Sequence, residues 1–357
     1  KNVDFIVIAE GEISFNNLLS VLGKNGDLKK VRGIGYKIGV KKFFNERQPL
    51  IEDISKLPIP AYDLLEFNKY HAPYTARHPF MSMIRSRGCP YLCTFCGVQS
   101  VFAHKYRCQT PQRSIQEIRY LVENFGVKEL AFKDSEFTLD KGNVEELCDL
   151  LVSAKFDLTW NCNGRVNNVN LKMLKKMKRA GCVSITYGVE SGDQQILNNL
   201  KKAITLDQVR QAIKISKQAG LKVITNFMIG NPGDTRETLG KTIKFAVELD
   251  TDYTYFGFTT PFPGTELREQ AIKNNWLLRK ELDAGKYEDI TMNATSLPTE
   301  ELKEYLNKAY RAFYFRPKYI LRRLVKLNRD ELRNSLYGFW SIVSDFYKTK
   351  AFKGKIK

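Results

Sequence analysis

The sequence predicts an α/β fold in which six strands alternate with helices between about residues 82 and 264. Three observations support this prediction. Short segments of strand character alternate with segments of helical period. Hydrophobic residues make up 43% of the 357 residues, which is enough for a large core. Polar residues gather where the strands end, which is where α/β proteins place their active sites. A doubly wound sheet and an open or partial barrel both fit this pattern.

The expected strands are short hydrophobic segments at 82–87, 129–134, 159–165, 184–191, 222–230 and 253–260. The expected helices lie between them at 114–125, 143–153, 170–179, 205–219 and 235–249. Asp234, with Glu237 three residues later, is typical of a helix N-terminal cap. Because a helix separates each strand from the next, the strands are expected to be parallel.

Further regions flank this array. A strand begins near Val3, a helix follows it, and 33–45 is typical of a short hairpin. Since the chain starts on Lys1, close to a strand, we expect part of the protein to lie upstream. The chain therefore divides into 1–50, a proline-containing linker at 51–80, the strand–helix array at 81–280 and a helical extension at 281–357.

Positive charge is concentrated near the C-terminus. The chain has 57 Lys and Arg against 39 Asp and Glu, a net charge of +18, and residues 301–357 hold +10 of it together with twelve aromatic residues. Such a segment fits a packed helical cap or a helix on an anionic membrane surface. The residues expected at that membrane are Phe313, Phe315, Tyr319, Trp340, Phe346, Arg322, Arg323 and Lys326. No apolar run of about 18 residues predicts a transmembrane helix.

Three of the seven cysteines form one cluster. Cys89, Cys93 and Cys96 lie in RGCPYLCTFC with the spacing C-x3-C-x2-C. An odd, clustered set favours a reducing compartment, here the cytoplasm, and metal ligation over disulfides. Structural zinc normally takes four ligands, so it would need Cys108 or His104. A 4Fe-4S cluster on three thiolates keeps one iron free for chemistry.

With Phe95 just before the last cysteine and a strand before the loop, this motif resembles that of the radical SAM superfamily. The resemblance implies a partial (β/α)6 TIM-like barrel and a 4Fe-4S cluster whose open iron is chelated by S-adenosylmethionine. It implies that an electron from the cluster cleaves S-adenosylmethionine to a 5′-deoxyadenosyl radical. An external reductant such as flavodoxin or ferredoxin is then the expected partner.

The resemblance also implies which residues contact S-adenosylmethionine. Asp134 and Ser135 occupy the position at which this superfamily contacts the amino group of S-adenosylmethionine. Arg165 and Glu190 resemble the residues that hold its carboxylate and ribose. The alternatives are a turn cap for Asp134 and a surface ion pair for Glu190. Glycine in FMIGNPGDT permits close backbone approach to adenine. The expected contacts are Phe95, Asp134, Ser135, Arg165, Glu190, Ser191, Gly230 and Asn231.

A narrower resemblance, to cobalamin-binding radical SAM proteins, extends over nearly the whole chain. It is carried by the order of VDFIVIAEGE, LPIPAYDLL, RGCPYLCTFC, GVESGDQQILNNLKK, FMIGNPGDT and TPFPGTEL. In that group a Rossmann-like cobalamin domain precedes the barrel, so residues 1–50 look like the last part of it. The resemblance implies cobalamin for the full-length protein, although no histidine here matches the cobalt-ligating motif of some relatives.

The resemblance implies methylation of an unactivated carbon in a lipid-like or secondary-metabolite substrate. Oxidative cyclisation or rearrangement is the first alternative. A tRNA-modifying methylthiotransferase is the second; it usually has a further cysteine-rich domain or an RNA-binding β-barrel, and neither is visible, so nucleic acid is not expected. A non-catalytic electron-transfer or membrane-docking protein would need four protein ligands for its cluster. The sequence assigns no catalytic acid, base or hydrogen donor.

Overall fold

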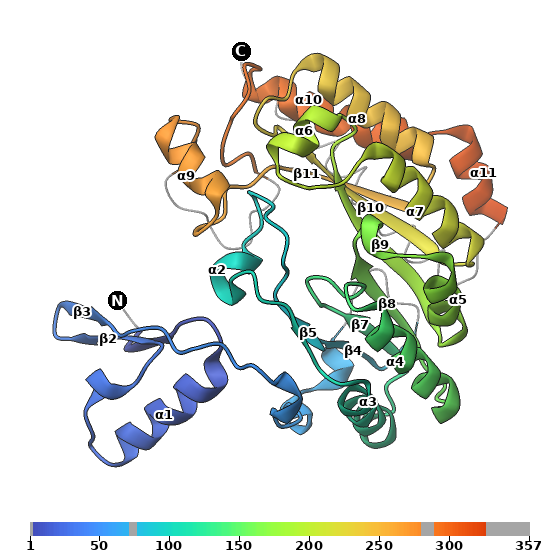
Figure 1. The fold of residues 1–357 in the computed structure, drawn as a ribbon. Coiled ribbons are helices and arrows are strands. Elements are labelled where there is room, and N and C mark those ends of the chain that lie inside the picture. Colours follow the sequence, from blue (N-terminus) through green and yellow to red (C-terminus); the bar gives the residue numbers. More distant parts are fainter. Residues whose placement is uncertain (1–2, 71–76, 280–288, 326–357) are drawn as a thin grey trace.

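The structure is a computed structural model that describes residues 3–70, 77–279 and 289–325. Its centre is a parallel sheet of six strands, β4 (Phe80–Met83), β7 (Glu129–Phe132), β8 (Thr159–Gly164), β9 (Cys182–Glu190), β10 (Lys222–Ile229) and β11 (Tyr253–Phe258). They lie in the order β11-β10-β9-β8-β7-β4, and every pairing is parallel. The expected parallel array is therefore confirmed. The sheet curves without closing, as a partial barrel does (Figure 1).

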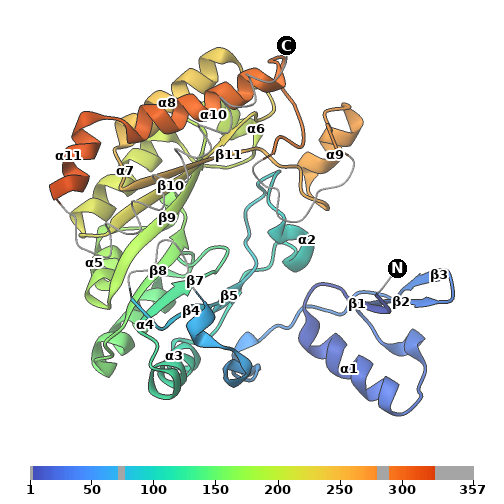
Figure 2. The ribbon, with the colours of Figure 1, turned by 180° about the vertical axis from the view of Figure 1, so that it is seen from behind.

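Helices connect the strands along the outer side of the sheet (Figures 1 and 2). They are α3 (Pro111–Phe125), α4 (Lys141–Ala154), α5 (Leu171–Arg179), α6 (Gln194–Asn199), α7 (Leu206–Gln218) and α8 (Arg236–Leu249). The cap expected at Asp234 is wrong, because Thr235 caps α8 in a reciprocal arrangement with Thr238. Asp234 instead accepts hydrogen bonds from the backbone N–H groups of Gly230 and Asn231. Its carboxylate shapes the loop that follows β10.

The main core lies between the sheet and these helices. Trp160 is fully buried and packs edge-on against Phe132, with Phe137 beside both rings. Burying such a side chain contributes about 1.5–3 kcal/mol. Cys148, Cys162 and Cys182 are also buried in this core, as thiols outside the cysteine cluster.

The first strand of the array is shorter than expected. It ends at Met83, and Ser86–Arg87 forms a separate strand, β5, antiparallel to β6 (Arg107–Cys108). The chain leaves the sheet at Arg85, whose fully buried guanidinium donates to Asn143 of α4 and lies over the Phe137 ring. The β5–β6 pair carries the chain out of the barrel and into the cysteine loop.

Residues 3–50 form a small unit beside the barrel (Figure 1). It contains β1 (Phe5–Val7), α1 (Gly11–Gly23), β2 (Ile34–Ile38) and β3 (Lys41–Phe44). The hairpin expected at 33–45 is confirmed as β2–β3. Both pairings in this three-stranded sheet are antiparallel, whereas Rossmann-like sheets are mostly parallel. Its assignment to the last part of a cobalamin domain stays a prediction.

A buried carboxylate joins this unit to the barrel. Glu10 accepts hydrogen bonds from Arg87 Nη1 at 2.9 Å, from Arg107 Nη1 at 2.8 Å and from the N–H of Ile51 at 2.8 Å. Burial raises the pKa of Glu10, but the hydrogen bonds from Arg87 and Arg107 outweigh it and hold the pKa below its ordinary value. Glu10 thus holds β5 and β6 together at the base of the cysteine loop.

After β11 come α9 (Glu266–Lys273), α10 (Thr299–Tyr314) and α11 (Pro317–Val325). The hydroxyl groups of Tyr310 and Tyr314 each accept from and donate to the free edge of β11, at Phe256 and Thr254, over 2.8–3.2 Å. An exposed sheet edge invites pairing with other chains. Two tyrosines one helical turn apart satisfy the backbone groups that a seventh strand would otherwise take.

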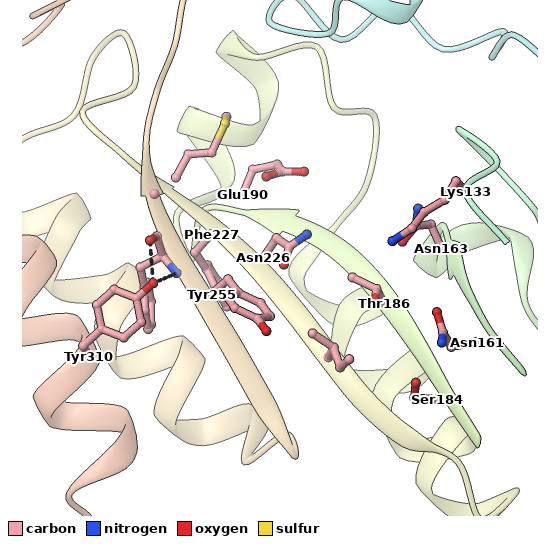
Figure 3. A pocket seen from close by; sticks show the side chains of 14 residues that line it. Lys133, Asn161, Asn163, Ser184, Thr186, Glu190, Asn226, Phe227, Tyr255 and Tyr310 are labelled. Carbon is pink, nitrogen blue, oxygen red and sulfur yellow. Dashed lines mark hydrogen bonds between the residues drawn. The ribbon is translucent and has the colours of Figure 1, made fainter. Parts of the chain in front are cut away.

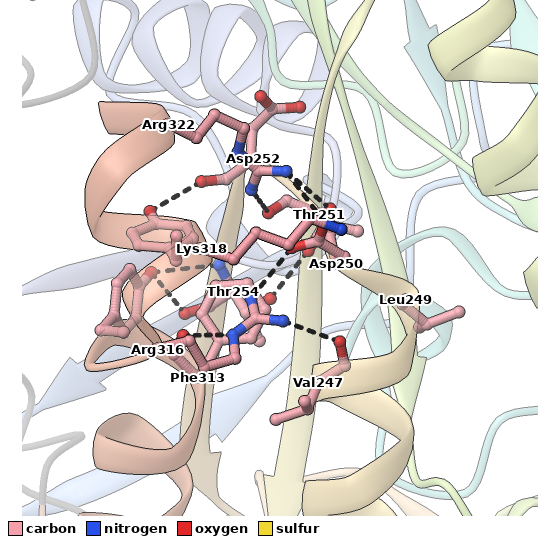
Figure 4. Close-up of polar contacts among 12 residues, drawn as sticks. Val247, Leu249, Asp250, Thr251, Asp252, Thr254, Phe313, Arg316, Lys318 and Arg322 are labelled. Atoms are coloured by element: carbon pink, nitrogen blue, oxygen red, sulfur yellow. Dashed lines mark hydrogen bonds and ion pairs between the residues drawn. The ribbon is translucent and has the colours of Figure 1, made fainter. Parts of the chain in front are cut away.

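The membrane role expected for this segment stays a prediction, and Phe315 is 54% exposed, but two of the other expected residues do not fit it. Phe313 and Tyr319 are 0% and 5% exposed, so they belong to the core. Arg322 donates to Asp250 at the end of α8 (Figure 4). Arg323 donates to the carbonyl of Asp252. The packed helical cap is therefore the better interpretation. Trp340, Phe346 and Lys326 lie outside the described residues. None of the described helices is long and apolar enough to cross a membrane.

Candidate active site

The cysteine loop follows β5 and is fixed at both ends. Gly88 adopts a left-handed φ of +80°, and a Cβ there would lie 2.0 Å from the backbone oxygen of Lys105, so only glycine fits. Thr94, between the second and third cysteines, donates its N–H to Leu200 at 3.1 Å and accepts from the N–H of Leu267 at 2.9 Å. The loop is thus tied to segments after α6 and at α9.

All three cysteines of the loop are free thiols. Cys93 is buried, and Cys89 and Cys96 are half-buried. Burial is the main cause that raises the pKa of Cys89 and of Cys96, and the neighbouring thiols add to it. Among the described residues no three His, Cys, Asp or Glu side chains converge closely enough for one metal ion. In a 4Fe-4S cubane each thiolate binds a different iron, so three cysteines would leave one iron without a protein ligand.

Arg165, at the end of β8, places a buried cation beside this loop. Its guanidinium lies 3.6 Å from the centroid of the Tyr91 ring, and Nη1 is 3.8 Å from Cys93 Sγ. Tyr91 is held in turn by Asn168, to which its hydroxyl donates at 2.8 Å. Nε and Nη2 of Arg165 are buried without a hydrogen-bond partner in the described part of the chain. A buried cation with unused donors is costly unless an anion binds there, and a carboxylate is the anion that guanidinium matches best.

Glu190 lies at the end of β9, where a bulge between β9 and β10 redirects the strand and φ is +71°. Its Oε1 accepts from Lys202 Nζ at 2.7 Å, and both side chains are buried. The alternative of a surface ion pair is therefore wrong; the pair is internal. Lys202 also lies 5.7 Å from the centroid of the Phe95 ring. Burial lowers the pKa of Lys202, but the charges of Glu190 and Cys93 and the hydrogen bond to Glu190 together outweigh it, so the net pKa is raised.

Gly188 makes room for this ion pair. A Cβ at Gly188 would lie 2.3 Å from Glu190 Oε1 and 2.9 Å from Lys202 Nζ. No real Cβ contact is that short, so a side chain at position 188 would displace the carboxylate. Gly188, two residues before Glu190, is thus part of the site.

Asp134, at the end of β7, is completely buried. Burial raises its pKa to about 6, against the charge of Arg85 and hydrogen bonds from Ser86. Ser86 Oγ donates to Oδ1, and the backbone N–H of Arg85 donates to Oδ2 at 3.5 Å. The carboxylate therefore bonds to β5 and caps no helix, since Asp140 caps α4. Ser135 beside it is exposed.

The remaining expected contacts have polar side-chain atoms that are already engaged. Ser191 Oγ lies 3.2 Å from Thr242 Oγ1 of α8. Asn231 Nδ2 donates to the carbonyl of Met228, and its Oδ1 accepts from Thr259. Gly230 has a φ of +84°. A ligand at this edge would therefore meet the backbone at 230–231.

Two residues near the cysteines were not foreseen from the sequence, Tyr91 and Lys202. Tyr91 lies inside the cysteine motif, and Lys202 ends the segment GVESGDQQILNNLKK. No spacing rule links either residue to its partner, because Arg165 is 74 positions from Tyr91 in the sequence. The only indication of their role in the sequence is that both lie inside motifs that carry the family resemblance.

The concave face of the sheet holds an open cavity of about 480 Å³ (Figure 3). Residues of β8 to β11 line most of it, and Glu190 lies at its upper rim as drawn. Its size is within the range of small-molecule sites. Glu190 is the only one of the residues expected at S-adenosylmethionine that lines it. The cavity therefore adjoins the cysteine-loop site without coinciding with it.

Comparison with known proteins agrees with this geometry. The family described as the Radical SAM superfamily matches residues 83–246. An uncharacterized methyltransferase of Pyrococcus horikoshii is 36% identical over 94% of this chain and 72% of its own length. Anaerobic magnesium-protoporphyrin IX monomethyl ester cyclase of Rubrivivax gelatinosus is 28% identical over 87% of this chain, which spans only 56% of that protein.

The fold itself recurs in a solved structure. The cobalamin-dependent S-adenosylmethionine radical enzyme OxsB, solved with aqua-cobalamin bound, superposes with a TM-score of 0.72 over 94% of this chain and 55% of its own. The sequence identity is 17%, so the likeness concerns the fold alone. It covers the small N-terminal unit as well as the barrel.

Proposed function

The chain belongs to the Radical SAM superfamily, and from this premise we propose that it carries the catalytic barrel of an enzyme that methylates an unactivated carbon of a small molecule. Membership implies a 4Fe-4S cluster and S-adenosylmethionine as cofactors. When bound, they supply the one-electron chemistry that activates an unreactive C–H bond. The protein supplies binding, orientation and the exclusion of water.

One observation carries the proposal: the half-partnered guanidinium of Arg165 lies 3.8 Å from a thiol of the three-cysteine loop. Cys89, Cys93 and Cys96 would hold the cluster. Arg165 would bind the carboxylate of S-adenosylmethionine beside it. The buried pair of Glu190 and Lys202, beside Phe95 of the same loop, would offer further hydrogen-bonding groups.

Methyl transfer is favoured by the relative from Pyrococcus, which the chain matches at 36% identity and which is named a methyltransferase. The cyclase from Rubrivivax supports oxidative cyclisation as the second candidate. The two differ in their by-products. Methyl transfer releases S-adenosylhomocysteine, whereas radical cyclisation releases 5′-deoxyadenosine and methionine without S-adenosylhomocysteine.

We extend the proposal to cobalamin in the full-length protein, because the solved OxsB structure contains it. Residues 3–50 offer no side chain that we assign to cobalamin, so no step is derived through it. The substrate would be lipid-like or a secondary metabolite, and a flavodoxin or ferredoxin would deliver the electron.

The test uses full-length protein, reconstituted with iron and sulfide without oxygen and given dithionite and S-adenosylmethionine. We expect S-adenosylhomocysteine and 5′-deoxyadenosine by mass spectrometry. C93A should lose bound iron and both products, since one iron of the cluster loses its ligand. C108A removes a thiol outside the loop and should keep both. If wild-type protein forms neither product, the proposed function is refuted, and 5′-deoxyadenosine without S-adenosylhomocysteine would refute methyl transfer in favour of cyclisation.

A further inference from the structure

The walls of the cavity differ in polarity (Figure 3). The side formed by β8, β9 and the end of β7 is polar, with Lys133, Asn161, Asn163, Ser184 and Thr186. The side formed by β10 and β11 is more apolar and aromatic, with Ile224, Met228 and Tyr255 among its residues. A ligand in this cavity therefore meets hydrogen-bonding groups on one side and hydrocarbon on the other.

Strand register gathers the polar groups into neighbouring rows. Asn161 is the register partner of Ser184, and Asn163 is the partner of Thr186. The apolar side contains one amide, that of Asn226, which is the register partner of Tyr255 on the neighbouring strand. Parallel strands covered on both faces are usually Val-, Ile- and Leu-rich, and closed barrels fill their interior with such side chains. This interior departs from that rule on its polar side.

These polar side chains have few protein partners. Asn161, Ser184, Thr186 and Asn226 line the cavity, and within the described chain their side chains make no hydrogen bond. They are half-buried, so the cavity is where their donors and acceptors point. A hydrocarbon chain in this space would strip them of water and offer nothing in return, which costs free energy at every group.

We propose that this cavity selects a water-soluble substrate with several hydrogen-bonding groups, which bind the polar wall while a smaller apolar part rests on β10 and β11. The inference rests on the proposed function and decides between its two substrate classes, against the lipid-like one. Because Glu190 belongs to both the cavity rim and the cofactor site, a substrate seated here lies next to the reacting centre.

The test measures how extracts stimulate turnover of S-adenosylmethionine. Reconstituted full-length protein is incubated without oxygen with reductant and either the water-soluble or the chloroform-soluble fraction of cells that carry the gene. We expect the water-soluble fraction to raise total S-adenosylhomocysteine and 5′-deoxyadenosine at least threefold above the rate without extract. Stimulation by the lipid fraction, or by neither fraction, would overturn the inference.

Variants connect that stimulation to the wall. N226L and T186V replace polar groups by apolar ones of similar shape, and we expect each to cut the ratio of stimulated to unstimulated rate about tenfold. N124L makes the same change as N226L on the exposed surface of α3 and should keep the ratio. Thermal midpoints establish that each variant is folded. Unchanged ratios in both wall variants would also overturn the inference, whereas failure of wild-type turnover without extract would refute the proposed function instead.

Discussion

The buried pair of Glu190 and Lys202 should be a major determinant of stability at the site. Replacing Lys202 by Met keeps the length of the side chain and removes the ammonium group. Glu190 would then be a buried carboxylate without its cation. The side chains of the two residues are only 9% and 10% exposed, so water cannot take over the role of the missing partner.

Breaking a buried ion pair on one side costs about 3–5 kcal/mol, because the remaining charge stays desolvated. For a domain of this size that corresponds to a decrease in thermal midpoint of roughly 6 °C or more. Replacing both residues, as in the E190Q/K202M double variant, leaves no charge uncompensated. The double variant should therefore be more stable than K202M alone.

The assay is thermal unfolding followed by circular dichroism on anaerobically purified protein. Lys201 provides the matched control, because its ammonium pairs with Glu266 at 2.7 Å while the two side chains are 52% and 40% exposed. K201M should cost no more than about 1 kcal/mol. The reasoning is refuted if K202M is no less stable than K201M, or if the double variant is less stable than K202M.

Three further substitutions test the cysteine loop, the buried Glu10 and the C-terminal helices. G88A should abolish iron binding, because the added Cβ would clash with the backbone of the cysteine loop. The control G126A changes a left-handed glycine with open space around it, so it should bind iron normally and lower the free energy of unfolding by only about 1–2 kcal/mol. The iron content after reconstitution tests both expectations. E10Q should have a lower thermal midpoint than the wild type at pH 7. Because the pKa of Glu10 in the folded protein lies below 4.5, the difference between the two midpoints should shrink as the pH falls through 4.5 and below. An equal difference at every pH would contradict this reasoning. F313A should cost about 3–5 kcal/mol in chemical denaturation, and F315A, 54% exposed, should cost far less; equal losses would argue against the packed cap.

Local pattern was sufficient for most of the barrel. The five expected helices and six expected strands of the array all exist, since their periods are set by which side chains face the core. The errors fell where a single side chain redirects the chain. Arg85 ends β4 early by burying its guanidinium, and Thr235 replaces Asp234 as a cap because the Asp234 carboxylate binds backbone groups of its own loop.

The C-terminal helices show what composition alone leaves open. Aromatic residues beside Arg and Lys fit a membrane surface as well as a protein surface, and composition does not distinguish them. The structure distinguishes them by the free edge of β11, which needs hydrogen-bonding partners and receives the hydroxyl groups of Tyr310 and Tyr314. Only the position of that edge explains why tyrosine is needed there.

The sequence by itself determined the parallel strand–helix array and the three-cysteine loop, because both follow from the spacing of residues that lie close together in the chain. The tertiary structure alone decided which distant side chains meet that loop. Arg165 stacks on Tyr91, and Lys202 pairs with Glu190 in the space left by Gly188. Such contacts depend on strand register and on a bulge in β9, and no local spacing encodes either of them.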